Sequence, residues 1–427
     1  MRPLRVLQVD SVYGRGGAAG IAGSLVRGLR QRGAQCWHAV GYAESAPGDV
    51  IRLDSAATSG TDRLIRRLKR PWKRRGLEDF DFPRSRRLLE LAPVAPDVVH
   101  CHNLHGDYFD LRYLPRLSRS RPTFVTLHDA WMLSGHCAHS FDCDRWRGGC
   151  GDCPDLSIPP SIPVDRTADN WRRKAAIYQR SRLMIATPSH WLMQKVEASM
   201  LMPGVVEARV IPNGVDLNVF GVDEDQASAR DALGLPQNAF VVVFAAHGIR
   251  ANVWKDIDTL RSAFGIFAEG SRSETQNVFL ALGESAPPEC EGKAEIRFVP
   301  YIADRVALAR YYRAADVYVH AARADTFPST ILEALACGTP VVATAVGGIP
   351  EQVRSLHDKI GSEATGVLTP PSDPHAMAAA IARLASDRLL LARMGDNARR
   401  DAVRRFDVSR QVDEYLAWYC TKVGGGA

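Results

Sequence analysis

Short hydrophobic runs alternate with longer segments of helical periodicity along most of the chain. In the first half the runs lie at residues 4–10, 96–102, 122–128 and 184–189, and each is too short for a helix. Continuous apolar runs of this length are typical of strands buried on both faces of a parallel sheet. The first run leads into a glycine-rich segment, 14–20, and then a helical pattern through Leu25 and Leu29. This order predicts a strand, a loop and a helix.

The alternation starts again in the second half. Strand-like runs lie at residues 239–246, 278–282, 296–299, 317–320 and 341–344, and the pattern is helical from Met377 onward. Two such series predict an α/β protein with two doubly wound, Rossmann-like domains that face a cleft. A Pro-Asn-Gly breaker near position 213 marks the boundary. We expect an acceptor-side domain at 1–216 with a cysteine-rich loop at 136–155, a nucleotide-sugar domain at 217–405, and a helix at 406–427 that packs back on the first domain and ends in a frayed tail.

The composition is that of a soluble globular enzyme. The chain has 427 residues, of which 46% are hydrophobic and 24% charged, so more than one domain is expected. No hydrophobic run is long enough to span a membrane, and the N-terminal residues lack the core of a signal peptide. We therefore expect a cytoplasmic protein. The net charge of +6 is modest, and we expect no nucleic-acid partner.

One segment concentrates positive charge. Eight basic residues lie between positions 63 and 75, with hydrophobic residues among them: Arg63, Arg66, Arg67, Lys69, Arg70, Lys73, Arg74 and Arg75, with Leu64, Ile65, Leu68 and Trp72. Such a stretch can be a solvated helix, or it can bind an anionic membrane or a phosphorylated acceptor. The pattern leaves both interpretations open.

Two carboxylates, Asp325 and Glu333, flank a predicted helix start. Pro328 fits the first turn, where a missing N–H costs nothing, and hydrophobic residues follow at helical spacing. Free N–H groups at a helix start bind anions, and a carboxylate further along can accept hydrogen bonds from sugar hydroxyls. Acids that cap an ordinary helix would have the same spacing. The spacing of Asp325 and Glu333 alone therefore does not distinguish a ligand site from helix capping.

Histidines end two of the predicted strands in the first domain. His102 and His128 each follow a hydrophobic run, and Asp129 comes next to the second. Open parallel sheets bind ligands at the carboxyl ends of their strands. A single histidine there is usually structural. With two of them, and Asp129 beside the second, a functional and a structural role for His128 are equally open.

Several motifs together resemble one family. They are the segments 211–216 and 325–343, together with the region of Lys255. They resemble the retaining glycosyltransferases of family 4, group 1, which have the GT-B fold, and segments 126–131 and 187–191 are similar to the branch of colanic-acid and exopolysaccharide enzymes. The resemblance covers nearly the whole chain. It implies transfer of a sugar from a nucleotide diphosphate sugar to a hydroxyl, with retained anomeric configuration and no catalytic metal or other cofactor.

The resemblance also implies a donor site in the second domain. Glu333 would hold the ribose hydroxyls, and Asp325 takes the position of a glutamate that addresses the donor sugar. The backbone N–H groups of Ser329 and Thr330 would bind the diphosphate. The shorter side chain of Asp325 departs from the usual glutamate and would change reach or sugar preference.

Two cations complete the implied donor site. Lys255 and Arg250 match the family's lysine and arginine, which neutralise the departing diphosphate. Asp256 stands where the family usually has glycine.

In the first domain, His128 matches a family histidine near the reacting carbon, and Gly16 and Gly17 match a loop that approaches the donor. The resemblance thus implies His128, Asp325 and Lys255 as the catalytic residues.

Four cysteines form a separate signal. Cys137, Cys143, Cys150 and Cys153 lie within seventeen residues of one another, beside His136. In a cytosolic chain, clustered cysteines are more often metal ligands than disulfides. They predict a structural zinc ion, although the spacing is not that of a standard zinc ribbon, and free or redox-active thiols are the alternative.

We therefore expect a glycosyltransferase, cytoplasmic or peripheral on the inner face of the membrane, that acts on a saccharide or lipid-linked saccharide in envelope or exopolysaccharide synthesis. The alternatives are a transferase for a small soluble natural product, a sugar-nucleotide-binding protein without transfer activity, and a nucleotide-sugar epimerase.

Overall fold

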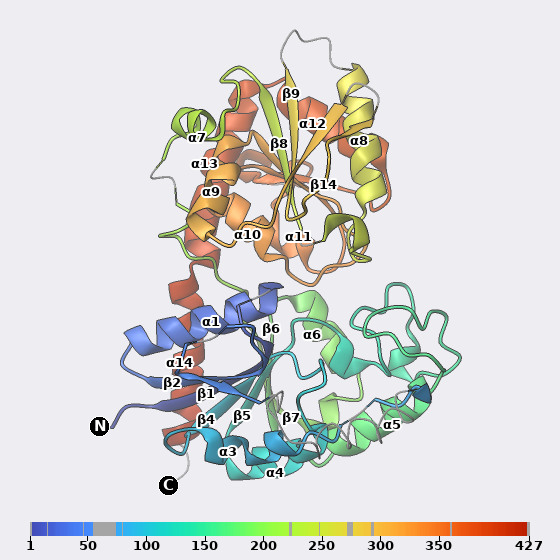
Figure 1. The fold of residues 1–427 in the computed structure, drawn as a ribbon, viewed down its shortest axis with the longest axis vertical. Coiled ribbons are helices and arrows are strands. Elements are labelled where there is room, and N and C mark those ends of the chain that lie inside the picture. The colour runs from blue at the N-terminus through green and yellow to red at the C-terminus, as the bar shows by residue number, and fades with distance from the viewer. Residues whose placement is uncertain are drawn as a thin grey trace. The chain divides into compact units, whose positions relative to one another are not determined.

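The computed structural model describes residues 2–14, 16–45, 47–53, 74–78, 80–221, 224–246, 248–270, 276–291, 294–358 and 361–424. The chain divides into two compact units (Figure 1). The first unit comprises Met1–Pro212 and Gln411–Ala427, and the second comprises Asn213–Arg410. The division lies four residues before the expected boundary at 216, because Gly214 already packs against Val408 of the second unit.

The first unit is built on a seven-stranded parallel sheet with the order β3-β2-β1-β4-β5-β6-β7. Its strands are β1 (Arg5–Val12), β2 (Gln35–Tyr42), β3 (Val50–Arg52), β4 (Val98–Cys101), β5 (Thr123–Thr126), β6 (Leu183–Thr187) and β7 (Val205–Val210). Its helices are α1 (Gly16–Gln31), α3 (Leu88–Leu91), α4 (Leu114–Ser120), α5 (Thr167–Tyr178), α6 (His190–Glu197) and α14 (Val408–Gly424). The strand order reverses at β1 and β4, and at such a switch point the strand ends are free to hold a ligand.

The second unit has a seven-stranded sheet with the order β10-β11-β9-β8-β12-β13-β14, in which only the edge pair of β10 and β11 is antiparallel among the described residues. Its strands are β8 (Phe240–Ala245), β9 (Asn277–Leu282), β10 (Glu289–Glu291), β11 (Ala294–Val299), β12 (Val317–His320), β13 (Val341–Thr344) and β14 (Gly366–Thr369). Its helices are α7 (Gln226–Leu233), α8 (Ile257–Gly270), α9 (Arg305–Ala314), α10 (Ser329–Ala336), α11 (Ile349–Gln352), α12 (Pro374–Ala385) and α13 (Arg388–Phe406). Short 3-10 helices lie at Pro83–Arg87, Leu111–Tyr113, Trp131–Leu133, Arg145–Arg147, Met202–Gly204, Ile249–Ala251 and Gly361–Glu363.

Alternate side chains of the second sheet enter two hydrophobic cores. Val241 and Val243 of β8 pack with α9, α10 and the C-terminal half of α13, whereas Phe240, Val242 and Phe244 pack with α8, α12 and the start of α13. The two groups of helices cover opposite faces of the sheet (Figure 1). A strand covered on both faces must be hydrophobic at every position, and this explains the continuous apolar runs.

Helix α14 belongs to the first unit, although it follows the second unit in sequence. Trp418 and Tyr419 are fully buried, and the ring of Phe124 on β5 meets the Trp418 ring edge-on with the centroids 4.8 Å apart. On the other side, Gly28 of α1 lies so close to Val412 that an added Cβ would come within 2.4 Å of that side chain. Close helix packing therefore requires glycine at position 28.

The nine strands predicted from hydrophobic runs are confirmed as β1, β4, β5, β6, β8, β9, β11, β12 and β13. Five strands were not predicted. They are β2, β3, β7, β10 and β14. The predicted glycine-rich loop is shorter than expected, because α1 already begins at Gly16. Here the burial of Ala19, Ile21 and Ala22 against the sheet outweighs the weak helix propensity of glycine.

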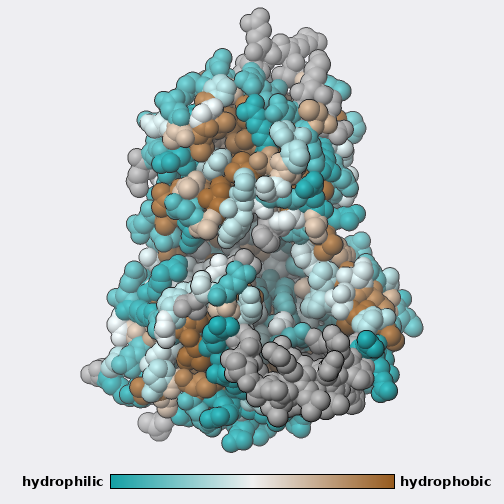
Figure 2. All heavy atoms as spheres, in the orientation of Figure 1, coloured by the Kyte–Doolittle hydropathy of each residue, from teal (hydrophilic) through white to brown (hydrophobic). Residues whose placement is uncertain are grey.

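The basic segment at 63–75 lies outside the described residues except for Arg74 and Arg75, both of which are exposed. Among the described helices, none is both long and apolar enough to cross a bilayer. On the face displayed in Figure 2, hydrophobic and hydrophilic residues are interspersed.

Candidate active site

A buried charged cluster lies at the carboxyl end of β12 in the second unit. It consists of Lys255, His320 and Asp325, and we call it the Lys255 cluster. The Lys255 Nζ atom lies 2.6 Å from Asp325 Oδ2 and 2.9 Å from His320 Nε2. The Lys255 side chain is 11% exposed and that of Asp325 is 20% exposed. The segment before α8 holds Lys255 there, because its backbone bridges to Ala322 beyond the end of β12.

The protonation states within the cluster follow from its contacts. Burial, reinforced by the Lys255 charge, lowers the pKa of His320 to about 4, so the ring is neutral. An ammonium group can only donate, so His320 Nε2 accepts from Lys255 and Nδ1–H donates to the Tyr318 hydroxyl at 2.9 Å. Burial alone would raise the pKa of Asp325, but the Lys255 charge holds it well below its usual range. The cluster therefore contains one cation and one carboxylate at neutral pH.

The start of α10 lies directly after this cluster. Pro328 is the N-cap residue, one position before the first turn where the sequence was expected to place it, and no side chain caps the helix. The N–H groups of Ser329 and Thr330 are therefore available to an anion. The Gln352 side-chain amide donates to the Pro328 carbonyl at 3.0 Å and fixes the entry into the helix.

Glu333 lies one turn further along α10 and is almost completely buried. The Tyr312 hydroxyl donates to its Oε2 atom at 3.2 Å, and an Arg305 nitrogen lies 3.8 Å from Oε1. Burial raises the pKa of Glu333 to about 7, against the opposing effect of Arg305. A carboxylate with so few donors around it is suited to accept hydrogen bonds from a ligand.

A glycine turn closes over Asp325. Gly347 has a positive φ of 57°, and an added Cβ would come within 1.8 Å of the Asp325 carbonyl oxygen. The N–H of Gly348 also points to that oxygen at 3.4 Å. Only glycine fits at position 347, because both the dihedral angle and the space exclude a side chain.

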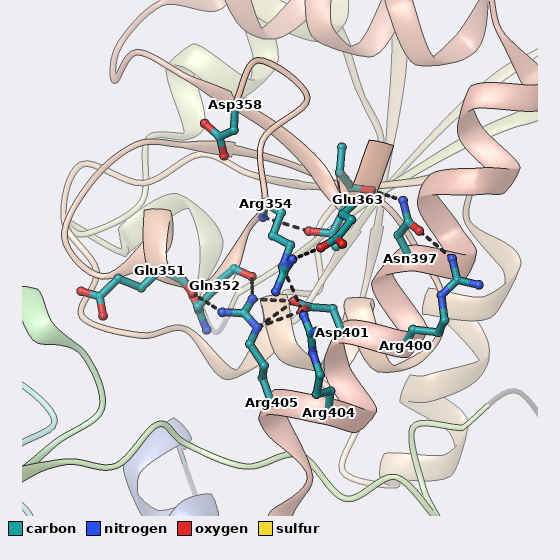
Figure 3. Close-up of polar contacts among 12 residues, drawn as sticks. Glu351, Gln352, Arg354, Asp358, Glu363, Asn397, Arg400, Asp401, Arg404 and Arg405 are labelled. Atoms are coloured by element: carbon teal, nitrogen blue, oxygen red, sulfur yellow. Dashed lines mark hydrogen bonds and ion pairs between the residues drawn. The ribbon is translucent and has the colours of Figure 1, made fainter. Parts of the chain in front are cut away.

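A cluster of ion pairs joins α13 to the end of α11 (Figure 3). Asp401 is 4% exposed and accepts from Arg405 and Arg354 at 2.5–3.0 Å. Arg405 also donates to the carbonyls of Glu351 and Gln352 at 2.8 and 2.9 Å. These bonds connect the end of α11 to α13. Because the side chain of Gln352 also donates to the Pro328 carbonyl, they restrain the start of α10 as well.

In the first unit, His102 and His128 lie side by side after β4 and β5. His128 Nε2 lies 3.0 Å from His102 Nδ1, and the two rings are stacked with centroids 5.3 Å apart. Burial lowers the pKa of His128 to about 4, so the ring is neutral. His102 is 1% exposed and His128 is only partly buried, so His128 is the one that can meet a ligand.

Comparison with known proteins assigns the chain to a family. The sequence-family model described as Glycosyltransferase Family 4 matches residues 15–219. The family model described as Glycosyl transferases group 1 matches residues 225–401. The chain belongs to these glycosyltransferases.

Two similar proteins can be aligned with this chain over most of their sequences. The colanic acid biosynthesis glycosyl transferase WcaC of Escherichia coli K12 is 25% identical over 383 residues, which are 84% of this chain and 88% of WcaC. The D-inositol 3-phosphate glycosyltransferase 1 of Catenulispora acidiphila is 34% identical over 351 residues, which are 78% of this chain and 74% of that protein.

Solved structures share the fold. The sucrose-phosphate synthase of Thermosynechococcus elongatus has a TM-score of 0.71 at 21% identity, over 99% of this chain and 100% of that one. The Anabaena protein HepE, in complex with UDP and glucose, has a TM-score of 0.64 at 19% identity, over 97% of this chain and 99% of that one. The glycosyltransferase thus has the GT-B fold, and the predictions of the family and of the fold are confirmed.

The structure of the glycosyltransferase brings some of the predicted residues together and leaves others apart. Lys255 and Asp325 are paired, with the first turn of α10 next along the chain. Arg250 is not part of the Lys255 cluster, because its guanidinium pairs with Glu284 at 2.5 Å and lies 3.6 Å from Glu289. Asp256, at the usual glycine position, accepts from the Thr259 N–H and the Ser372 hydroxyl. It therefore has a structural role at the start of α8.

Gly16 and Gly17 of the glycosyltransferase occupy the first turn of α1. Gly16 has a φ of 82°, and an added Cβ would meet no atom within 4 Å. Its role is therefore conformational, or it leaves room for a ligand.

The cysteine loop does not assemble the predicted zinc ligands. The Gly135 N–H donates to Cys150 Sγ at 3.3 Å, and His136 Nε2 lies 3.3 Å from Cys153 Sγ. Among the described residues, which include all four cysteines of the loop, no three His, Cys, Asp or Glu side chains are arranged as ligands of one metal ion. Cys150 and Cys153 each have a hydrogen-bond contact with a residue outside the group of four cysteines.

Two functional candidates of the glycosyltransferase were missed. His320 ends a predicted strand, as His102 and His128 do, and that pattern could have identified it. Asp10 at the end of β1 is fully buried, its Oδ2 atom has no hydrogen-bond partner, and burial raises its pKa to about 7. Nothing in the spacing around Asp10 distinguishes it from an ordinary strand residue.

Proposed function

We propose that this protein is a retaining glycosyltransferase that moves a sugar from a nucleotide diphosphate sugar to a hydroxyl of a saccharide acceptor in envelope or exopolysaccharide synthesis. The family membership supports glycosyl transfer, and the similarity to WcaC over most of both chains supports a polysaccharide acceptor. The proposal includes a cytoplasmic location and catalysis that needs no metal ion.

The observation that carries the proposal is the Lys255 cluster beside the open start of α10. A buried ammonium 2.6 Å from a carboxylate, followed by an uncapped helix start, suits a ligand that combines a diphosphate with sugar hydroxyls. In our proposal Lys255 and the N–H groups of Ser329 and Thr330 bind the diphosphate, Asp325 binds a hydroxyl of the sugar, and Glu333 binds the ribose. Arg250 would join them after leaving Glu284.

The proposed chemistry needs no base from the protein. The acceptor oxygen forms a bond to the anomeric carbon as the bond from that carbon to the diphosphate breaks, and the leaving phosphate oxygen takes the acceptor proton. Reaction on one face retains the configuration. His128 has a neutral ring and would orient the donor sugar rather than act as a nucleophile.

The first experiment is a donor panel. Full-length protein is heated with uridine, guanosine, adenosine and thymidine diphosphate sugars, and the donor that raises the melting temperature is then offered saccharide acceptors. We expect transfer with retained configuration, measured by NMR of the product. An inverted product would contradict the retaining mechanism.

Paired variants test the site assignment. Glu333→Ala combined with His128→Ala should abolish transfer, whereas Glu269→Gln, at an exposed position of α8, should leave it unchanged. Transfer that survives the double variant would refute the assignment. Donor binding without transfer or hydrolysis would favour the non-transferring alternative, and epimerised nucleotide sugar would favour the epimerase.

A second candidate function is transfer to a small soluble natural product. The basic segment separates it from the envelope proposal: neutralising Arg66, Arg67, Arg70 and Arg74 should abolish transfer to an acceptor in anionic vesicles and preserve transfer to a soluble one. Equal activity on both acceptors would contradict peripheral membrane binding.

Structural zinc in the cysteine loop is a separate prediction. The four thiols are not arranged as ligands of one metal ion among the described residues, so zinc binding would require this loop to rearrange. We expect about one zinc ion per chain by elemental analysis of protein purified without chelators. A folded, zinc-free protein would contradict it.

A further inference from the structure

A continuous chain of hydrogen bonds leads from His128 into the core of the first unit. We call it the histidine chain, and its members in order are His128, His102, Gln8, Tyr419, His100, Thr126 and Tyr415. The successive distances are 3.0, 2.8, 3.5, 2.5, 2.7 and 2.7 Å. Every member except His128 is at most 2% exposed. The chain thus connects the carboxyl ends of β4 and β5 with two tyrosines of α14.

All three rings of the chain are neutral. Burial lowers the pKa of His100 to about 3 and that of His102 well below its usual value, and it lowers the pKa of His128 to about 4. A neutral imidazole has one N–H donor and one bare nitrogen, and a glutamine amide has one donating and one accepting end. The direction of one bond therefore determines the direction of the others.

Gln8 sets this direction. Its Oε1 atom faces His102 Nε2, so that nitrogen carries the proton and His102 Nδ1 is bare. His128 must then donate from Nε2, and its own Nδ1 is bare. On the other side, Gln8 Nε2 donates to the Tyr419 oxygen, Tyr419 donates to His100 Nδ1, and His100 Nε2 donates to Thr126.

Reversing one bond would require reversing all of them. If Gln8 were turned by 180°, its amide nitrogen would donate to His102, and His128 would present an N–H at Nδ1. Tyr419 would then have to donate to Gln8 and accept from His100. The hydroxyl of Tyr419 thus couples the orientation of Gln8 to the direction of the bonds at His100 and Thr126.

We propose that α14, acting through Tyr419, Gln8 and His102, holds His128 in the tautomer whose bare Nδ1 accepts a hydrogen bond from a substrate hydroxyl. The identity of that hydroxyl as one of the sugar substrates rests on the proposed function, whereas the tautomer itself does not. Gln8, His102 and Tyr419 are positioning residues. The tautomer of His128 and the identity of the hydroxyl that it binds can therefore be tested separately.

The tautomer is measured by NMR of full-length protein labelled with ¹⁵N in histidine. Long-range ¹H–¹⁵N correlation distinguishes protonated from bare ring nitrogens, and the His128→Gln variant identifies the His128 signals among the 12 histidines. We expect a protonated Nε2 and a bare Nδ1 in the unmodified protein. A proton on Nδ1 of His128 would overturn the proposal, and this measurement needs no positioning variant to fold.

Two matched variants test the role of α14. Tyr419→Phe removes the hydroxyl between Gln8 and His100, and we expect a mixture of His128 tautomers and a transfer rate lower by about two- to tenfold, the range for one neutral hydrogen bond. Tyr415→Phe removes an equally buried hydroxyl at the far end of the chain, and there we expect the single tautomer to remain. An unchanged His128 spectrum in Tyr419→Phe would overturn the proposal. If no donor is ever transferred, the spectra still decide the tautomer while the proposed function fails on its own.

Discussion

Glu333→Gln should make the second unit more stable while it weakens donor binding. The pKa of Glu333 rises from 4.5 to about 7 through burial. The folded protein thus binds this proton more tightly than the unfolded chain does. The stabilisation from Glu333 is present below pH 4.5 and is lost as the pH rises through about 7. Glutamine is neutral at every pH, so the Glu333→Gln variant does not lose stability through ionisation at this position as the pH rises.

The magnitude follows from the pKa. At about 1.4 kcal/mol per tenfold change in proton affinity, the cost of ionising Glu333 at pH 8 is at most about 3 kcal/mol. Remaining exposure of the side chain and the nearby Arg305 reduce the expected gain to about 2 kcal/mol. In a unit of this size, about 2 kcal/mol corresponds to a melting temperature higher by about 4–8 °C.

Scanning calorimetry at pH 8 and pH 5 measures the gain. We expect Glu333→Gln to melt higher than the unmodified protein at pH 8 and almost equally at pH 5, with Glu269→Gln as the exposed control. A nucleotide diphosphate should stabilise the variant far less, because the ribose loses a charged acceptor worth about 1.5–3 kcal/mol. A variant that melts lower at pH 8, or whose gain is the same at both pH values, would refute the reasoning.

Three further predictions concern the same unit. Lys255→Met leaves Asp325 buried without its cation, so we expect urea unfolding to show a loss of about 3–5 kcal/mol; adding Asp325→Leu should restore part of it but no transfer. Gly347→Ala should lower stability by more than about 2 kcal/mol through its clash with the Asp325 carbonyl, whereas Gly270→Ala, with open space around it, should be nearly neutral in the same assay. Arg405→Leu removes the donors to the carbonyls of α11, and we expect a higher donor KM with little change in kcat from steady-state kinetics; a change confined to kcat would contradict the bracing role.

The sequence could predict the central strands because they are covered on both faces. A strand such as β8 is hydrophobic at each of its six positions, so its pattern is unambiguous. Strand β2 contains Gln35, Trp37 and His38 and has no such run, and β3 and β10 are only three residues long at sheet edges. These elements form because a neighbouring strand is available to pair with them, which a local pattern does not record.

The candidate site could be predicted in its residue types but not in its pairings. Asp325 and Glu333 were found from a helix start, since both lie within one short segment. The ion pair of Lys255 with Asp325 joins positions 70 residues apart, and the bond from Gln8 to Tyr419 joins positions 411 apart. Such contacts depend on the complete fold. For the same reason the pairing of Arg250 with Glu284, which keeps it away from the Lys255 cluster, had no signal in the sequence.

The docking of α14 on the first unit has a consequence for the order of folding during synthesis. The ribosome must add the 212 residues from Asn213 to Gly424 before the last helix of the first unit is complete. At about 5–20 residues per second this takes roughly 10–40 s. During that time the surface of β5 around Phe124, which Trp418 and Tyr419 later cover, is exposed to solvent. The second unit, whose residues are continuous, is thus the first that can finish folding, and the nascent first unit is the natural client for a chaperone.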